Sequence, residues 1–216
     1  MPKPIKILTF AGSTRESSYN KKLVRLACKK LDDQKIQNKF IDLRDFPLPF
    51  YDGDLEAKGP YPEKALELKN ILKSHDAFLI ASPEYNSSIS AVLKNTIDWL
   101  SRYDNKGDLS AFSGKVVAVV SASPGQLGGL RGLNHIRSIL TNIGCFVIPN
   151  QLAINQAHMA FDEKGLLSDP TRNQQFDGII QALVQTAKRF NVDLEDYCSK
   201  VFGDYCKEQM APMTPK

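Results

Sequence analysis

The sequence lacks the residue patterns that mark several large classes of protein. Its four cysteines, at positions 28, 145, 198 and 206, form no C-x-x-C pair, and no histidine lies at metal-ligand spacing from them. Neither a structural zinc site nor a dithiol centre is indicated, and no metal is expected. No apolar run has the length of a membrane span, and no signal peptide is visible. These absences favour a reduced, cytoplasmic protein without a membrane span.

Long blocks of like charge are also missing. Lys and Arg total 28 against 24 Asp and Glu, which gives a net charge of +4, and the two signs are interspersed. No basic arm is present, so no nucleic-acid partner is expected. The chain of 216 residues is 42% hydrophobic and 24% charged, the composition of one soluble globular domain.

The first loop lacks the motifs of the commonest nucleotide sites. Residues 10–20, FAGSTRESSYN, follow a short apolar run and hold a single glycine. The segment has neither G-x-G-x-x-G nor a closing Gly-Lys-Ser/Thr, and no cysteine for a C-x5-R phosphatase loop. It does offer hydroxyls and one arginine before a predicted helix, whose unpaired N–H groups and dipole attract anions. The segment therefore predicts a site for a single phosphate group, or else a polar capping loop without a ligand.

Apolar runs of strand length alternate with helical patterns along the chain. Strands are predicted at residues 5–10, 40–43, 77–81, 115–121 and 145–148, and helices at 21–31, 63–74, 90–102, 130–143 and 176–190. Residues 45–62 contain too many prolines and glycines for a regular element. Apolar strands between helices imply a parallel sheet covered on both faces. We therefore predict an α/β fold, a flavodoxin-like doubly wound sheet of five parallel strands in the order 2-1-3-4-5.

Two further polar loops follow the third and fourth predicted strands. Residues 82–89 supply a proline, a tyrosine ring and polar side chains, the mixture that an isoalloxazine ring needs. Residues 121–131 contain three glycines, which let the backbone approach a ligand closely. Each loop alone is equally compatible with an ordinary turn. Because the carboxyl ends of parallel strands meet at one edge of the sheet, all three loops should converge there, which favours a ligand site.

These motifs resemble those of the NADPH-dependent FMN reductase family, which includes quinone, azo-dye and chromate reductases. The resemblance covers residues 5–190 and rests mainly on segments 12–20, 82–102 and 128–131. Two positions depart from the family pattern. Ser87 stands where the family often has glycine, and Ser90 with Ala91 stands where it commonly has Pro-Gly. Neither change is expected to abolish FMN binding.

The resemblance implies an FMN site built from all three loops. Four residues are expected to hold the phosphate, four to line the ring and two to lie near the ring. They are Ser13, Arg15, Ser17 and Asn20; Pro83, Glu84, Tyr85 and Asn86; and Ser121 and Gly128. No residue stands out as a general acid or base, because the flavin carries the redox chemistry. Arg102, after the second loop, is a candidate for an ion pair with Glu84 across a subunit contact.

The implied function is that of an FMN-dependent NAD(P)H oxidoreductase. Hydride would pass from NADPH to bound FMN and on to quinone-type, azo or other small acceptors. Residues 1–192 would form the FMN-binding domain and 193–216 a C-terminal extension, in a homodimer or a tetramer. The alternative is a flavodoxin-like electron carrier or flavin-binding sensor without turnover of its own, and a third reading is a partner protein that has lost FMN. Carrier flavodoxins tend to be acidic, so the net charge of +4 favours the enzyme.

Overall fold

The computed structural model describes residues 4–103 and 106–191 of the chain. The predicted C-terminal extension lies outside these residues, so the division of the chain at residue 192 stays a prediction. In the part that is described, no helix combines the length and apolar character that crossing a membrane requires. Within the same residues, no group of three or more His, Cys, Asp or Glu side chains gathers to hold a metal ion.

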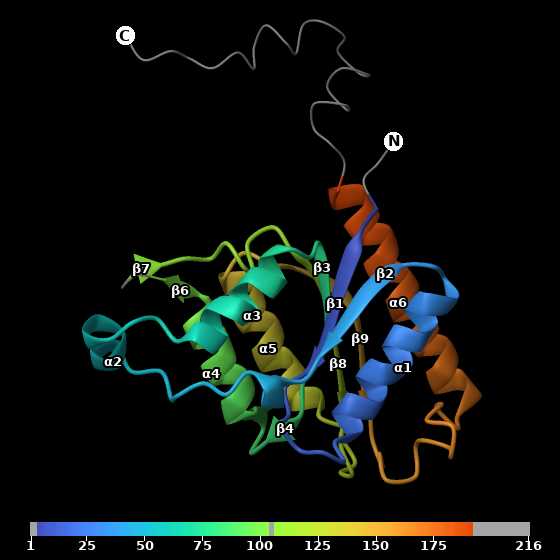
Figure 1. Cartoon of the computed structure of the whole chain (residues 1–216). Helices are drawn as coiled ribbons and strands as arrows, with labels where there is room; N and C mark the ends of the chain where they lie inside the picture. Colours follow the sequence, from blue (N-terminus) through green and yellow to red (C-terminus); the bar gives the residue numbers. More distant parts are fainter. Residues whose placement is uncertain (1–3, 104–105, 192–216) are drawn as a thin grey trace, which may run out of the picture.

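A five-stranded parallel sheet forms the middle of the molecule (Figure 1). Its strands are β1 (Lys6–Ala11), β2 (Gln37–Ile41), β3 (Ala77–Ala81), β8 (Val116–Ala122) and β9 (Phe146–Ile154). Their spatial order is β2-β1-β3-β8-β9, and all neighbours pair in parallel. Every residue of β3 and β8 is buried, as expected for strands covered on both faces. The predicted flavodoxin-like order 2-1-3-4-5 is thus confirmed.

Helices cover both faces of this sheet (Figure 1). One face carries α1 (Tyr19–Asp33) and α6 (Pro170–Phe190), and the other carries α3 (Glu63–Lys73), α4 (Ala91–Leu100) and α5 (Leu130–Asn142). Successive side chains of a strand point to opposite faces, so Ile7 and Leu8 of β1 enter different apolar clusters. The two clusters cover the two faces of the sheet, and they leave its carboxyl edge to the loops.

Some elements are longer than predicted. The helix α6 begins at Pro170 rather than at residue 176, because the Asp169 side chain accepts the N–H of Thr171 at 2.8 Å and proline suits the first turn. The strand β9 runs on to Ile154, past a register irregularity in its pairing with β8. Pro149 lies within this irregular stretch of an edge strand, where a missing N–H is tolerated.

Short elements occupy segments that were predicted to be irregular. Residues 45–62 contain the helix α2 (Gly53–Lys58), so the prediction that this connection lacks a regular element is wrong. The 3-10 helix η1 (Leu43–Asp45) follows β2. Two small hairpins complete the fold, and their strands are β4 (Glu84–Tyr85), β5 (Ser88–Ile89), β6 (Arg102–Tyr103) and β7 (Lys106–Gly107). The first hairpin lies in the second polar loop and shapes the site described next.

Candidate functional site

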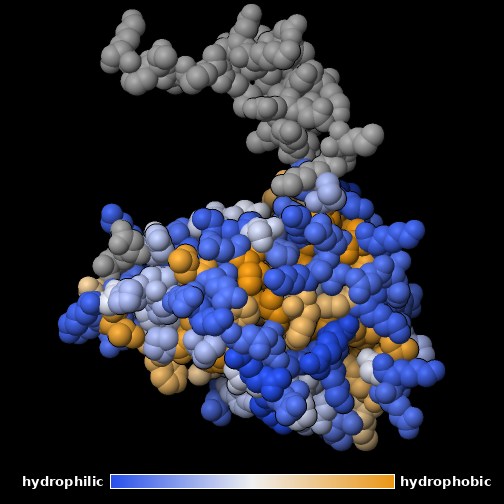
Figure 2. Space-filling view, in the orientation of Figure 1, coloured by the Kyte–Doolittle hydropathy of each residue, from blue (hydrophilic) through white to orange (hydrophobic). Residues whose placement is uncertain are grey.

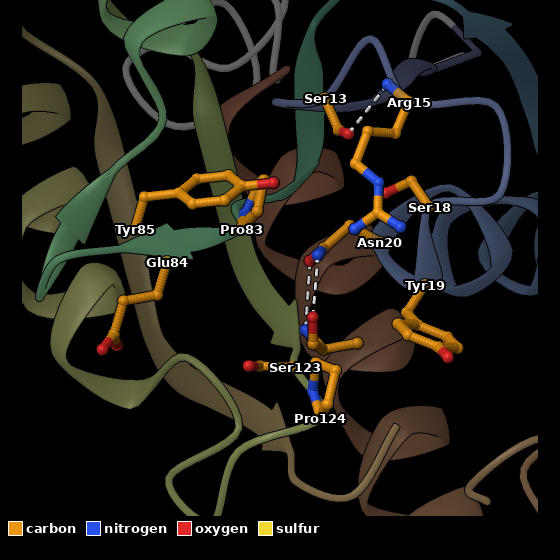
Figure 3. A pocket seen from close by; sticks show the side chains of 11 residues that line it. Ser13, Arg15, Ser18, Tyr19, Asn20, Pro83, Glu84, Tyr85, Ser123 and Pro124 are labelled. Carbon is orange, nitrogen blue, oxygen red and sulfur yellow. Dashed lines mark hydrogen bonds between the residues drawn. The ribbon is translucent and has the colours of Figure 1, made fainter. Parts of the chain in front are cut away.

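The loops after β1, β3 and β8 meet at the carboxyl edge of the sheet and enclose a cavity of about 170 Å³ (Figure 3). The residues that line it are Ser13, Arg15, Ser18, Tyr19, Asn20, Pro83, Glu84, Tyr85, Ala122, Ser123 and Pro124. The chain leaves β1 for β2 on one side and returns to β3 on the other, so this edge contains the topological switch point. Ligands of open α/β sheets bind at such points.

The first loop turns sharply where it leaves β1. The N–H of Gly12 donates to the carbonyl oxygen of Ala81 at 2.9 Å, which continues the sheet by one bond. A Cβ added at Gly12 would lie 2.7 Å from Cδ2 of Leu93, so only glycine fits this close against α4. The Ser13 hydroxyl then accepts the N–H of Arg15 at 3.2 Å and tightens the turn toward α1.

The N-terminus of α1 is open to an anion. Its N-cap residue Ser18 makes no capping hydrogen bond through its side chain, and the first turn contains no acidic residue. Ser18 is buried and lines the cavity, whereas the predicted ligand Ser17 is exposed and does not line it. The positive end of the helix dipole therefore faces the cavity without a carboxylate of its own helix to neutralise it. Sequence reasoning missed Ser18, although its place before the helical pattern is the signal for an N-cap.

The two other predicted phosphate residues have different surroundings. The guanidinium of Arg15 turns into the cavity beside Ser18 and Asn20 (Figure 3), and no ion pair joins Arg15 to a carboxylate of the described residues. The carboxamide of Asn20 donates to the carbonyl oxygen of Ala122 at 2.8 Å and accepts the N–H of Ala122 at 3.0 Å. Asn20 thus ties α1 to the end of β8, a contact that the sequence does not reveal.

The β4–β5 hairpin supplies a flat wall to the cavity. Pro83 and Tyr85 line it, and the ring of Tyr85 extends toward Pro83 (Figure 3) with half of its surface exposed. The turn residues Asn86 and Ser87 have φ values of 50° and 67°, the pattern of a two-residue type I′ turn. Asn86 therefore lies at the tip of the hairpin, and it is not among the residues that line the cavity. Ser87 occupies a backbone conformation that favours glycine.

Replacing Ser87 with glycine is expected to stabilise the protein by about 0.5–1 kcal/mol, because glycine adopts this conformation without steric cost. Urea unfolding at fixed pH measures the gain. Asn86→Gly is the matched control and should yield a smaller gain, since asparagine tolerates a positive φ better than serine does. A neutral or destabilising Ser87→Gly would show that the turn carries no strain.

Glu84 turns its carboxylate away from the cavity and onto α5 (Figure 3). One oxygen pairs with Arg131 at 2.8 Å, and the other accepts the N–H of Gly132 at 3.0 Å. Burial alone would raise the pKa of Glu84, but the Gly132 N–H and the Arg131 guanidinium outweigh it and lower that pKa. This anchor is therefore complete above the ordinary carboxyl pKa and weakens only as the pH falls through the lowered value.

Glu84 and Arg102, the candidates for an ion pair across a subunit contact, each have a partner within the chain. Arg102 donates through Nε to the buried Glu56 of α2 at 2.6 Å, while Glu84 is paired with Arg131. The hydroxyl of Tyr51 donates to the same Glu56 oxygen at 3.0 Å. Arg102 of β6 thus joins α2 to the segment directly after α4.

The predicted residues of the third loop lie beside the cavity and do not line it. Ser121 is fully buried and donates to the carbonyl oxygen of Gly128 at 2.8 Å. Gly128 and Gly129 have φ values of 63° and 95° and fold the loop back onto the end of β9. The lining residues from this loop are instead Ala122, Ser123 and Pro124. They come directly after the core of the strand, a position that sequence reasoning passed over in favour of the glycines.

The fold and the cavity together define a flavodoxin-like protein with a cavity at the switch point of its sheet, beside the N-terminus of α1. Residues 5–159 match the family model of NADPH-dependent FMN reductases, and the chain belongs to this family. An NAD(P)H:quinone oxidoreductase of Solanum tuberosum is 35% identical over 184 residues, which span 83% of this chain and 91% of the relative. A quinone reductase of Pseudomonas putida is 38% identical over 169 residues, 77% of this chain and 86% of that protein.

Solved structures give the same result. A flavoenzyme NAD(P)H:(acceptor) oxidoreductase from Paracoccus denitrificans is similar with a TM-score of 0.74 and 29% identity, over 86% of this chain and 98% of that one. A flavodoxin from the domain Archaea, with a TM-score of 0.55 and 12% identity, shows the fold alone. The family membership confirms the expected class, an oxidoreductase that depends on FMN and NAD(P)H.

Proposed function

We propose that this chain holds FMN in the cavity between its three loops and passes hydride from NADPH through it to quinone-type or other small acceptors. One observation carries the proposal: the Arg15 guanidinium points into the cavity beside the hydroxyl of Ser18, at the N-terminus of α1 (Figure 3). A flat wall formed by Tyr85 and Pro83 stands opposite. A phosphate site next to a flat wall fits the two ends of FMN.

The residues of the first loop would bind the phosphate. The buried hydroxyls of Ser13 and Ser18 would donate to phosphate oxygens, and Arg15 would balance the charge and could donate two hydrogen bonds. The first N–H groups of α1 add donors that cost nothing to orient, because the helix already holds them. The two hydrogen bonds between Asn20 and Ala122 hold the first loop against the start of the third loop.

Bound FMN supplies the hydride chemistry, and the protein supplies binding, orientation and electrostatics. The hairpin would cover one side of the ring with Tyr85, and the Glu84 contacts to Arg131 and Gly132 hold that hairpin on α5. The half-exposed Tyr85 leaves the site accessible to a second substrate. The quinone reductases of the family support quinone-type acceptors for this chain as well.

We also propose a cytoplasmic homodimer, with a tetramer as the alternative assembly. The cysteines that the structure describes, Cys28 and Cys145, are free thiols, which supports a reducing compartment. The assembly follows from the family resemblance, because enzymes of this kind commonly place an open site on a dimer or a tetramer.

The experiment that tests the proposed function is a flavin titration followed by anaerobic reduction. The purified protein should take up FMN with one site per chain, and the visible absorption of the bound flavin should bleach on mixing with NADPH. Subsequent addition of benzoquinone should restore the colour. A protein that takes up no FMN contradicts the flavin site, and one whose bound FMN bleaches slowly or not at all supports the carrier alternative instead.

A further inference from the structure

A hydroxyl of α4 reaches into the first loop of the site. Ser90 is the N-cap of α4, directly after the β4–β5 hairpin, and is 5% exposed. Its Oγ donates to the carbonyl oxygen of Gly12 at 2.6 Å and accepts the N–H of Leu93 at 3.3 Å. One side chain therefore caps α4 and also binds the backbone of a loop 78 residues earlier in the chain.

The contact with Ser90 completes the constraints on Gly12. Its N–H is bonded to Ala81, and its Cα lies so close to α4 that an added Cβ would be 2.7 Å from the Leu93 side chain. These two contacts do not set the direction of the Gly12 carbonyl group. The hydrogen bond from the Ser90 hydroxyl sets it, toward α4. In a trans peptide the C=O and the following N–H point in opposite directions. The N–H of Ser13 therefore points away from α4.

We propose that Ser90 is a positioning residue for the phosphate of FMN. By holding the Gly12 carbonyl against α4, it presents the N–H of Ser13 to the phosphate and keeps a carbonyl oxygen, which would repel the anion, out of the site. Ser90 does not touch the ligand and acts through the Gly12–Ser13 peptide. The inference rests on the proposed function, because it concerns the phosphate end of the same cavity.

The test compares FMN with riboflavin, which lacks the phosphate, by fluorescence titration of both flavins. Ser90→Gly removes the hydroxyl but keeps a residue that caps helices almost as well, so α4 should remain folded. We expect the dissociation constant for FMN to rise about tenfold, the effect of one hydrogen bond, with that for riboflavin unchanged. Ser90→Thr retains the hydroxyl and should restore the preference for FMN.

Asp169→Ala is the control for a general loss of helix capping, because Asp169 caps α6 and does not line the cavity. It should leave the ratio of the two dissociation constants unchanged. If Ser90→Gly weakens both flavins equally, or weakens neither, Ser90 has only a structural role and the inference is overturned. If the wild-type protein binds FMN and riboflavin equally well, the phosphate site itself is refuted. The titration of the wild type alone gives that result, so it is distinct from a failure of the Ser90 inference.

Discussion

Replacing Gly128 with alanine is expected to destabilise the protein by about 3 kcal/mol, the sum of a steric clash and an unfavourable φ. The residue has a φ of 63°, and an added Cβ would lie 2.7 Å from both the amide nitrogen of Asn155 and the carbonyl carbon of Ile154. Both are backbone atoms at the end of β9, so they cannot rotate away as a side chain would. The third loop would have to lift off the sheet to admit the methyl group.

Gly165 offers a matched control for this substitution. Its φ of 75° is similar, but nothing lies within 4 Å of an added Cβ. Gly165→Ala should therefore cost only the backbone preference, about 1 kcal/mol. Urea unfolding of both variants without flavin separates the two costs. If the two variants lose equal free energies of unfolding, the backbone at the end of β9 shifts at little cost, and the close approach of Gly128 does not constrain the loop.

Gly128 has a structural reason for being glycine that the resemblance does not reveal. The resemblance implies a residue near the flavin ring, and the structure adds that a positive φ brings Gly128 close to the backbone of residues 153–155. Ser121 is a similar case, since its hydroxyl donates its hydrogen bond to the carbonyl oxygen of Gly128. Neither residue lines the cavity, and their hydrogen bond joins the end of β8 to the third loop.

The fold itself could be predicted because its signals are local. The runs at residues 77–81 and 115–121 are apolar throughout, and a strand with no polar face must be buried on both sides. Sequence patterns also gave the three loops after β1, β3 and β8. The ends of elements were less well predicted: α6 begins earlier than its apolar periodicity because Asp169 and Pro170 set its start.

Features that depend on contacts between distant residues were not predictable. The helix α2 forms in a segment rich in proline and glycine, where Glu56 binds Arg102 from the end of α4 and the ring of Tyr51 packs edge-on against Trp99. The Asn20 carboxamide appears in the sequence as a phosphate donor, yet its partner Ala122 is 102 residues away. No periodicity reports such pairs.

Replacing Arg15 with alanine is expected to weaken FMN binding by about 10- to 100-fold, the range for a charge-assisted hydrogen bond. Riboflavin binding should not change, because it has no phosphate. Folding should stay within about 0.5 kcal/mol of the wild type, since the side chain is exposed and no ion pair joins it to a carboxylate of the described residues. Titration of each flavin by fluorescence, with urea unfolding alongside, measures these quantities.

Arg25→Ala is the charge-matched control, because it removes one positive charge from α1 at a residue that lies over the Phe40 ring rather than at the cavity. If it weakens FMN binding as much as Arg15→Ala does, the effect is a long-range field and not a contact. The neighbouring serines sharpen the test. Ser18→Ala should weaken FMN selectively while Ser17→Ala should not, because only Ser18 lines the cavity. If Ser17→Ala weakens FMN binding more than Ser18→Ala does, Ser17 contacts the phosphate, as the sequence motif predicted.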